Sequence, residues 1–185
     1  LMGRRQYAQA GEMFERAAQR SGGGSGAVRE LGISLLNQGQ AAAGIASLEQ
    51  AFKQNPRDLR AGIQLALAFA RQAQPAKAIA TAEAVVRQDP ENVEMLAFLG
   101  NVKGRSGDRA GARAAWEQAL RKDPNHRVSA INLNYLDIEE RKYDLARARM
   151  QLMLQRNPND FDVLFQLGTL EERQRRFQAA LDQWQ

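Results

Sequence analysis

Few side chains in this sequence are of the types that perform catalysis or bind metals. The chain has one histidine, His126, and no cysteine. A disulfide framework, a thiolate metal site, a histidine-rich metal site and a histidine-based catalytic triad are therefore all excluded. His126 follows Pro124 by two residues, and we expect it to lie in a linker as a surface or helix-capping residue. The sequence predicts no catalytic residue, no bound metal and no cofactor.

The glycine-rich stretch at residues 21–26, SGGGSG, is the next candidate, because glycine-rich loops can cradle phosphate groups. Such a loop requires a Gly-Lys-Ser or Gly-Lys-Thr sequence, and none follows here. We interpret the stretch as either a native flexible turn or an introduced linker.

The charge of the chain raises the question of nucleic acid binding. Its 185 residues carry a net charge of +5, with 26 lysines and arginines against 21 acidic residues. Acidic residues are interspersed with the arginines, as in Arg113–Glu117–Arg121, and this spacing predicts ion pairs on a solvated helix surface. The pattern disfavours a basic stripe for nucleic acid. No apolar run approaches the roughly 18 residues that cross a bilayer.

The elements that must position the remaining side chains follow a repeat. Prolines recur every 34 residues, at positions 56, 90, 124 and 158, and Asn or Asp precedes each of them. Proline ends helices, and between these prolines the apolar residues recur at i, i+3, i+4 and i+7. Each unit is therefore predicted to hold two helices separated by a tight turn, which Gly39, Gly107 and Pro75 mark in three units. Asp108 and the residues Asp58, Asn92 and Asp160 are predicted helix caps.

Aligned on their prolines as position 32, the units share further residues. Position 7 is always leucine: Leu31, Leu65, Leu99, Leu133 and Leu167. Position 20 is always small: Ala10, Gly44, Ala78, Ala112, Ala146 and Ala180. Position 8 is small in most units, as at Gly100, and position 24 is mostly large, as at Trp116. Small residues at positions 8 and 20 predict a close approach of the two helices in each unit.

This pattern resembles the tetratricopeptide repeat, whose units are 34 residues long. The resemblance implies an all-α fold, a right-handed superhelical solenoid of antiparallel helix pairs. The expected units are the second half of a truncated repeat (1–20), a glycine-rich linker (21–24), four full repeats (25–58, 59–92, 93–126 and 127–160) and a truncated repeat (161–185). Position 11 departs from the family pattern, because Lys103, Asp137 and Glu171 stand where an aromatic residue is usual. We expect Val102, Leu136 and Leu170, at position 10, to take over that packing.

The resemblance also implies that the first helix of each unit lines a concave wall. Helical spacing places positions 2, 5, 9 and 12 on one stripe of that wall, with positions 6 and 13 beside it. The candidate partner-binding residues there are Gln64, Leu67, Arg71, Phe98, Asn101, Arg105, Ile131, Asn132, Tyr135 and Phe165. Their mixture of amides, arginines and apolar groups suits an extended peptide. Packing between repeats is the alternative role for the apolar members, and a bond between helices is the alternative for Asn101 and Asn132.

The leading hypothesis is a non-catalytic scaffold that binds another protein or a peptide segment. Segments such as NPRDLRAGIQLALAF are similar to bacterial tetratricopeptide lipoproteins of exopolysaccharide export and PEP-CTERM sorting. That similarity implies polysaccharide secretion machinery as a partner and a periplasmic or outer-membrane-associated setting, in place of a cytoplasmic one. The alternatives are a repeat arm of a larger enzyme, whose catalytic domain lies outside this sequence, and a nucleic-acid-associated adaptor.

The sequence ends at Gln185 within a helical pattern. We expect Leu181 and Trp184 to leave an uncovered apolar face there, through which copies of the chain self-associate.

Overall fold

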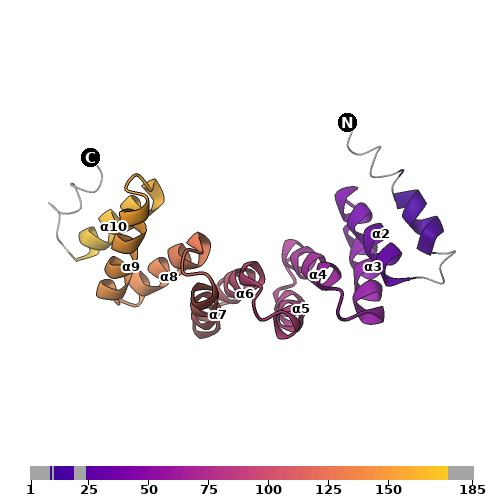
Figure 1. Cartoon of the computed structure of the whole chain (residues 1–185), viewed down its shortest axis with the longest axis horizontal. Coiled ribbons are helices and arrows are strands. Elements are labelled where there is room, and N and C mark those ends of the chain that lie inside the picture. The colour runs from indigo at the N-terminus through magenta and orange to yellow at the C-terminus, as the bar shows by residue number, and fades with distance from the viewer. Residues whose placement is uncertain (1–8, 10, 19–23, 175–185) are drawn as a thin grey trace.

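A computed structural model describes residue 9 and residues 11–18 and 24–174 of the chain. Residues 9 and 11–18 are helical, and nine further helices occupy residues 24–174 (Figure 1). Their bounds are α2 (Ser25–Asn37), α3 (Ala41–Gln54), α4 (Leu59–Arg71), α5 (Pro75–Gln88), α6 (Val93–Arg105), α7 (Arg109–Lys122), α8 (Arg127–Glu139), α9 (Tyr143–Arg156) and α10 (Phe161–Arg173). No strand occurs in this part of the chain. The prediction of an all-α solenoid is confirmed.

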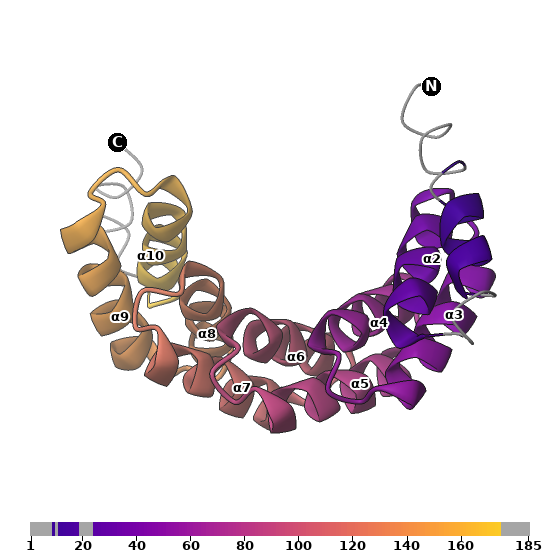
Figure 2. The same ribbon diagram turned by 45° about the vertical axis from the view of Figure 1, so that its right-hand side comes forward.

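The helices form an arc with an inner and an outer layer. Helices α2, α4, α6, α8 and α10 line the concave side, and α3, α5, α7 and α9 lie outside them (Figure 2). Each helix packs mainly on its neighbours along the chain. This is the behaviour of a solenoid, in which each unit buries the apolar face of the next.

Short polar side chains set where the helices begin. Asp58, Asn92 and Asp160 accept hydrogen bonds from backbone N–H groups in the first turns of α4, α6 and α10, and Asp108 does so for α7. These caps satisfy N–H groups that have no partner within the helix. His126 caps α8, because its Nδ1 accepts from the backbone N–H of Ser129 at 3.3 Å. The predicted caps and the capping role of His126 are confirmed.

The turn inside each unit uses one backbone conformation at one repeat position. Gly39 and Gly107 have φ of +83° and +88°, and Ala73 and Arg141 have φ of +53° and +60° at the equivalent position. Only the glycines mark this left-handed residue in the sequence. A side chain in the left-handed region carries a steric cost, which Ala73 and Arg141 bear.

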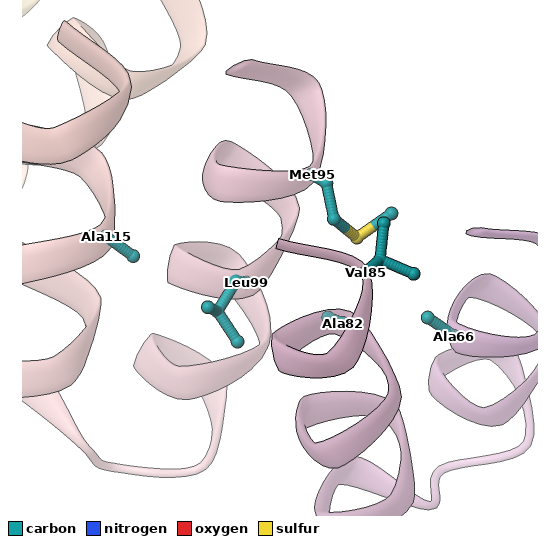
Figure 3. Packing of buried hydrophobic residues seen from close by; sticks show 6 residues of the cluster. All are labelled: Ala66, Ala82, Val85, Met95, Leu99 and Ala115. Atoms are coloured by element: carbon teal, nitrogen blue, oxygen red, sulfur yellow. The ribbon is translucent and has the colours of Figure 1, made fainter. Parts of the chain in front are cut away.

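Apolar side chains fill the space between successive units. Val85 of α5 lies beside Met95 of α6 in one buried cluster with Ala66, Ala82, Leu99 and Ala115 (Figure 3). Similar clusters join the later units. The apolar face of each helix pair is thereby covered by the next pair.

The two helices of a unit meet where the side chains are small. A Cβ added at Gly32 would lie 3.0 Å from the backbone oxygen of Gly44, so these two backbones are in direct contact. At Gly100 the space is filled by the Trp116 indole, 2.4 Å from where a Cβ would stand. The predicted close approach of positions 8 and 20 is confirmed at Gly32 and Gly44, whereas Gly100 at position 8 packs on Trp116 at position 24.

Position 11 carries charge in the later units, and the structure shows how that charge is accommodated. Val102, Leu136 and Leu170 at position 10 are buried and supply the apolar packing, as predicted. Asp137 at position 11 is completely buried and pairs with Arg113 of the preceding unit at 2.5 Å and with Arg149 at 2.9 Å. The prediction that Arg113 lies on a solvated surface is therefore wrong, because its main contact is the buried Asp137. The predicted pair with Glu117 is also present, at 3.6 Å.

Asp160 should make the stability of the α8–α10 region depend on pH. Hydrogen bonds from Arg127, at 2.9 and 3.1 Å, and from the backbone N–H of Val163 hold the pKa of Asp160 below its usual range. Because the pKa is lower in the folded state, the charge stabilises the fold above about pH 4 and this contribution is lost as the pH falls further.

The variant Asp160→Asn keeps a capping side chain but removes the charge. We expect it to be less stable than the wild type at pH 7, with the difference shrinking towards pH 2 in urea denaturation. A difference independent of pH would contradict this role for Asp160.

Several predictions concern residues outside the described part of the chain. They are the start of the first truncated repeat, most of the linker at 21–24, and the end of the last repeat with Leu181 and Trp184.

Candidate functional site

Ten candidate side chains were predicted on the concave wall, and they are distributed over four inner helices. Helix α4 carries Gln64, Leu67 and Arg71; α6 carries Phe98, Asn101 and Arg105; α8 carries Ile131, Asn132 and Tyr135; and α10 carries Phe165. The inner position of these helices is seen in Figure 2. The structure brings Asn101, Arg105, Asn132 and Tyr135 together around cavities between α6, α7 and α8.

A fixed pair of amides lies at the centre of this region. The Asn101 Oδ1 accepts a hydrogen bond from Trp116 Nε1 at 3.1 Å and another from Asn132 Nδ2 at 2.9 Å. The indole nitrogen only donates, so the atom of Asn101 that faces it must be the oxygen. That choice also fixes the orientation of Asn132, whose nitrogen must face Asn101. The alternative role of these asparagines, a bond between helices, is therefore present.

The hydrogen bonds leave part of each amide unused. Among the described residues, neither Asn101 Nδ2 nor Asn132 Oδ1 has a hydrogen-bond partner. Both asparagines border a concave cavity of about 500 Å³ that is also lined by Gly104, Arg105 and Trp116. The residues that line the cavity thus include an unused donor and an unused acceptor, and a buried tryptophan fixes the orientation of both amides.

Tyr135 borders a second cavity one turn further along α8. This cavity, of about 310 Å³, shares Gly104, Trp116 and Asn132 with the first. The Tyr135 side chain is 50% exposed, so its ring is available to a partner. At the rim of the cavity Arg109 and Glu139 form an ion pair at 3.1 Å.

Exposed apolar side chains continue along the inner helices towards α10. Phe161 is 76% exposed and Phe165 is 50% exposed, and their rings stack with centroids 6.5 Å apart. Val128 on α8 is also exposed. Single exposed apolar residues are common, but several on neighbouring inner helices are typical of a surface that another molecule covers.

The other predicted residues have different surroundings. Phe98 is half-buried and packs against two core clusters, so much of its surface serves the fold. Gln64, Leu67 and Ile131 are half-buried and Arg71 is exposed. Gln166, beside Phe165, is fully buried and donates to the backbone oxygen of Ile131 at 3.2 Å.

Sequence reasoning missed Trp116 and Phe161 as part of this surface. It placed position 2, where Val128 lies, on the concave stripe but did not name Val128 as a candidate. Trp116 was predicted only as a packing residue, because position 24 faces the other helix of its unit. A signal was present, since the indole of a buried tryptophan needs an acceptor and Asn101 occupies the facing helix. Phe161 opens its helix and therefore lies at the edge of the periodic pattern.

The described part of the chain also limits other kinds of site. Nowhere in it do three potential metal-binding side chains from histidine and acidic residues come together. None of its helices has the length and apolarity that crossing a membrane requires.

Comparison with known proteins identifies the repeat. A family model described as tetratricopeptide repeat matches residues 29–93, 63–102, 99–152 and 135–185. These matches together span the chain from residue 29 to its end. No curated protein matches the sequence significantly.

Solved structures share the fold at low sequence identity. YrrB, described as a TPR protein with an unusual peptide-binding site, is 15% identical with a TM-score of 0.78, covering 94% of this chain and 89% of its own. MamA from Desulfovibrio magneticus RS-1 is 17% identical with a TM-score of 0.72, covering 83% and 88%. PilF of Pseudomonas aeruginosa is 20% identical with a TM-score of 0.70, covering 86% and 73%. At these identities the similarity shows the fold alone.

Proposed function

The chain belongs to the tetratricopeptide repeat family, and on that premise we propose that its concave wall binds an extended segment of a partner protein between α6, α7 and α8. Proteins with this fold bind protein or peptide partners and are generally non-catalytic scaffolds.

The observation that carries the proposal is the fixed amide pair. A peptide bond offers one acceptor, its C=O, and one donor, its N–H. The unused Asn101 Nδ2 and Asn132 Oδ1 offer the complementary donor and acceptor at the border of a cavity of about 500 Å³. Because Trp116 fixes both amides, little side-chain entropy would be lost when a peptide backbone binds there.

Apolar contacts would add to these backbone bonds. Tyr135 lies half-exposed on α8, at the adjoining cavity of about 310 Å³. Phe165 lies half-exposed on α10, beyond that cavity. Aromatic rings supply large contact areas with little loss of conformational freedom, and they are frequent where interfaces are strongest. We therefore place the side chains of the bound segment along α8 and α10.

The double variant Asn132→Ala with Tyr135→Ala should weaken binding of the partner segment about tenfold or more. Peptides are first selected on the wild-type chain from a random library, and their Kd values are then measured by fluorescence anisotropy. Asn101 is kept, because its loss would leave the buried Trp116 Nε1 without an acceptor.

The matched control is Leu152→Ala, which removes a side chain that is 55% exposed on the outer helix α9. It should leave the Kd unchanged. Equal Kd values for the wild type and the folded double variant would overturn the assignment to the concave wall.

For the biological setting we propose envelope polysaccharide export or assembly in a bacterium, with secretion machinery as the partner. Support for this setting comes from the sequence resemblance to exopolysaccharide-export lipoproteins. Deleting the gene should then lower the amount of polysaccharide that reaches the cell surface. An unchanged amount would remove this setting and would leave the binding surface itself unaffected.

A further inference from the structure

A separate cavity lies at the edge of the arc where the turns of two consecutive units meet. It measures about 300 Å³ and is lined by Ala70, Ala73, Pro75, Val102, Arg105 and Ser106. The first three residues come from the end of α4, the turn and the start of α5, and the others come from the end of α6. The lining is mostly apolar, apart from Arg105 and Ser106.

Ser106 is already engaged within its own helix end. Its hydroxyl donates to the backbone oxygens of Val102 and Lys103, at 3.0 and 2.9 Å. Arg105 differs, because it is exposed and forms no ion pair with any residue that the structure describes. Of the two polar side chains that line this cavity, the one that is free to bind another molecule is therefore a cation.

The next unit carries a different charge at this position. At the position of Arg105 it carries Glu139, which pairs with Arg109 at 3.1 Å. The edge between α6 and α8 is thereby neutralised within the chain. The edge between α4 and α6 keeps an uncompensated guanidinium beside an apolar cavity.

Arg105 also borders the concave cavity of Asn101, Trp116 and Asn132. One side chain thus separates the concave wall from the cavity at the turn edge. A chain that leaves the concave wall across α6 must pass this guanidinium before it reaches the apolar lining.

We propose that this edge is a second recognition site, which takes an acidic residue followed by an apolar residue of a protein segment. The carboxylate pairs with Arg105, whose planar guanidinium matches a carboxylate geometrically. The apolar side chain enters the cavity formed by Ala70, Ala73, Pro75 and Val102. This inference rests on the proposed function only in naming the partner segment, because the edge site uses neither Asn101 nor Asn132, although Arg105 borders both cavities.

Arg105 could also stabilise its own helix, which is a different role from binding a carboxylate. Arginine in the last turn of a helix interacts favourably with the negative end of the helix dipole. Arg71 and Arg173 occupy the same repeat position in the last turns of α4 and α10. They supply matched controls, because a role in helix stability would be common to all three arginines.

The test uses the complete 185-residue chain labelled with ¹⁵N and three capped tetrapeptides: Gly-Asp-Leu-Gly, the charge-reversed Gly-Lys-Leu-Gly, and Gly-Asp-Ser-Gly. Titration with Gly-Asp-Leu-Gly should shift the backbone amide resonances of Ala70, Ala73 and Val102. We expect Arg105→Gln to weaken this binding about fivefold. Arg71→Gln and Arg173→Gln should leave it unchanged, and the other two peptides should bind more weakly.

Three results would overturn the proposal: no shift at these amides, equal shifts with the lysine peptide, or undiminished binding to Arg105→Gln. A single-stranded oligonucleotide that shifts the same amides in an Arg105-dependent way, and binds more tightly than the peptide, would assign the site to nucleic acid and also overturn it. The Asn132→Ala, Tyr135→Ala variant should still bind the tetrapeptide. Failure of the concave-wall proposal is therefore distinguishable from failure of this one.

Discussion

Replacing Gly100 with leucine should lower the free energy of unfolding by about 3 kcal/mol. Even the first carbon of the new side chain would stand 2.4 Å from Trp116 Nε1 and 2.5 Å from its Cδ1. The indole is almost fully buried and is held by its hydrogen bond to Asn101, so it has little room to withdraw. Either α6 and α7 separate or the tryptophan leaves its place, and both disrupt close packing.

Chemical denaturation followed by far-UV circular dichroism measures this loss. Gly26→Ala is the control, because a Cβ added at that helical glycine would meet no described residue within 4 Å beyond its chain neighbours and its own helix backbone. It should be neutral or stabilising, by up to about 1 kcal/mol, since alanine favours helix. A Gly100→Leu chain as stable as the wild type would contradict the close contact of positions 8 and 24. The variant should also disturb the concave cavity, because Trp116 lines it.

Asp137→Ala should lower the free energy of unfolding by about 3 kcal/mol or more, although position 11 is usually apolar in this family. The Asp137 side chain is completely buried and neutralises two arginines at once, Arg113 and Arg149. The side chains of these arginines are only 18% and 23% exposed. Removing the carboxylate would leave Arg149 without a carboxylate partner among the described residues and Arg113 with Glu140 alone, at 2.9 Å, and with Glu117 at 3.6 Å. Breaking a buried ion pair in this way is strongly destabilising.

The adjacent ion pair provides the comparison. Glu139 and Arg109 are 51% and 63% exposed, and pairs on the surface contribute at most about 1 kcal/mol. Glu139→Ala should therefore change the free energy of unfolding far less than Asp137→Ala, in denaturation experiments at the same pH and salt concentration. Similar losses for the two variants would show that burial does not govern the strength of the Asp137 network.

The Asp137 network extends to a residue whose type departs from the repeat pattern. Asn134 occupies position 8, where most units have glycine or alanine, and its helices α8 and α9 pack less closely than α6 and α7. Its side chain is fully buried, accepts from Arg149 at 2.9 Å and donates to Gln166 at 3.1 Å. Polar bonds thus replace the close backbone contact in this unit.

The sequence by itself determined the helical fold, the turns and most of the caps. These features depend on local chemistry: proline ends a helix, a small side chain permits close approach, and Asp or Asn accepts from free N–H groups. The same pattern recurs every 34 residues, so that weak matches in successive repeats together make one strong signal. The inner position of the helices that carry the candidate residues was implied by the resemblance to the tetratricopeptide repeat.

Only the tertiary structure decided which polar side chains meet. Asp137 and Arg113 are 24 residues apart, and Asn101 and Asn132 are 31 apart. Their pairing depends on the rotation between neighbouring units, which no local spacing specifies. The same holds for Arg105, whose freedom from any ion pair in the described chain contrasts with Glu139 at the equivalent position. A charged side chain can reach several neighbours, and the folded geometry selects among them because burial and hydrogen bonding act over only a few ångströms.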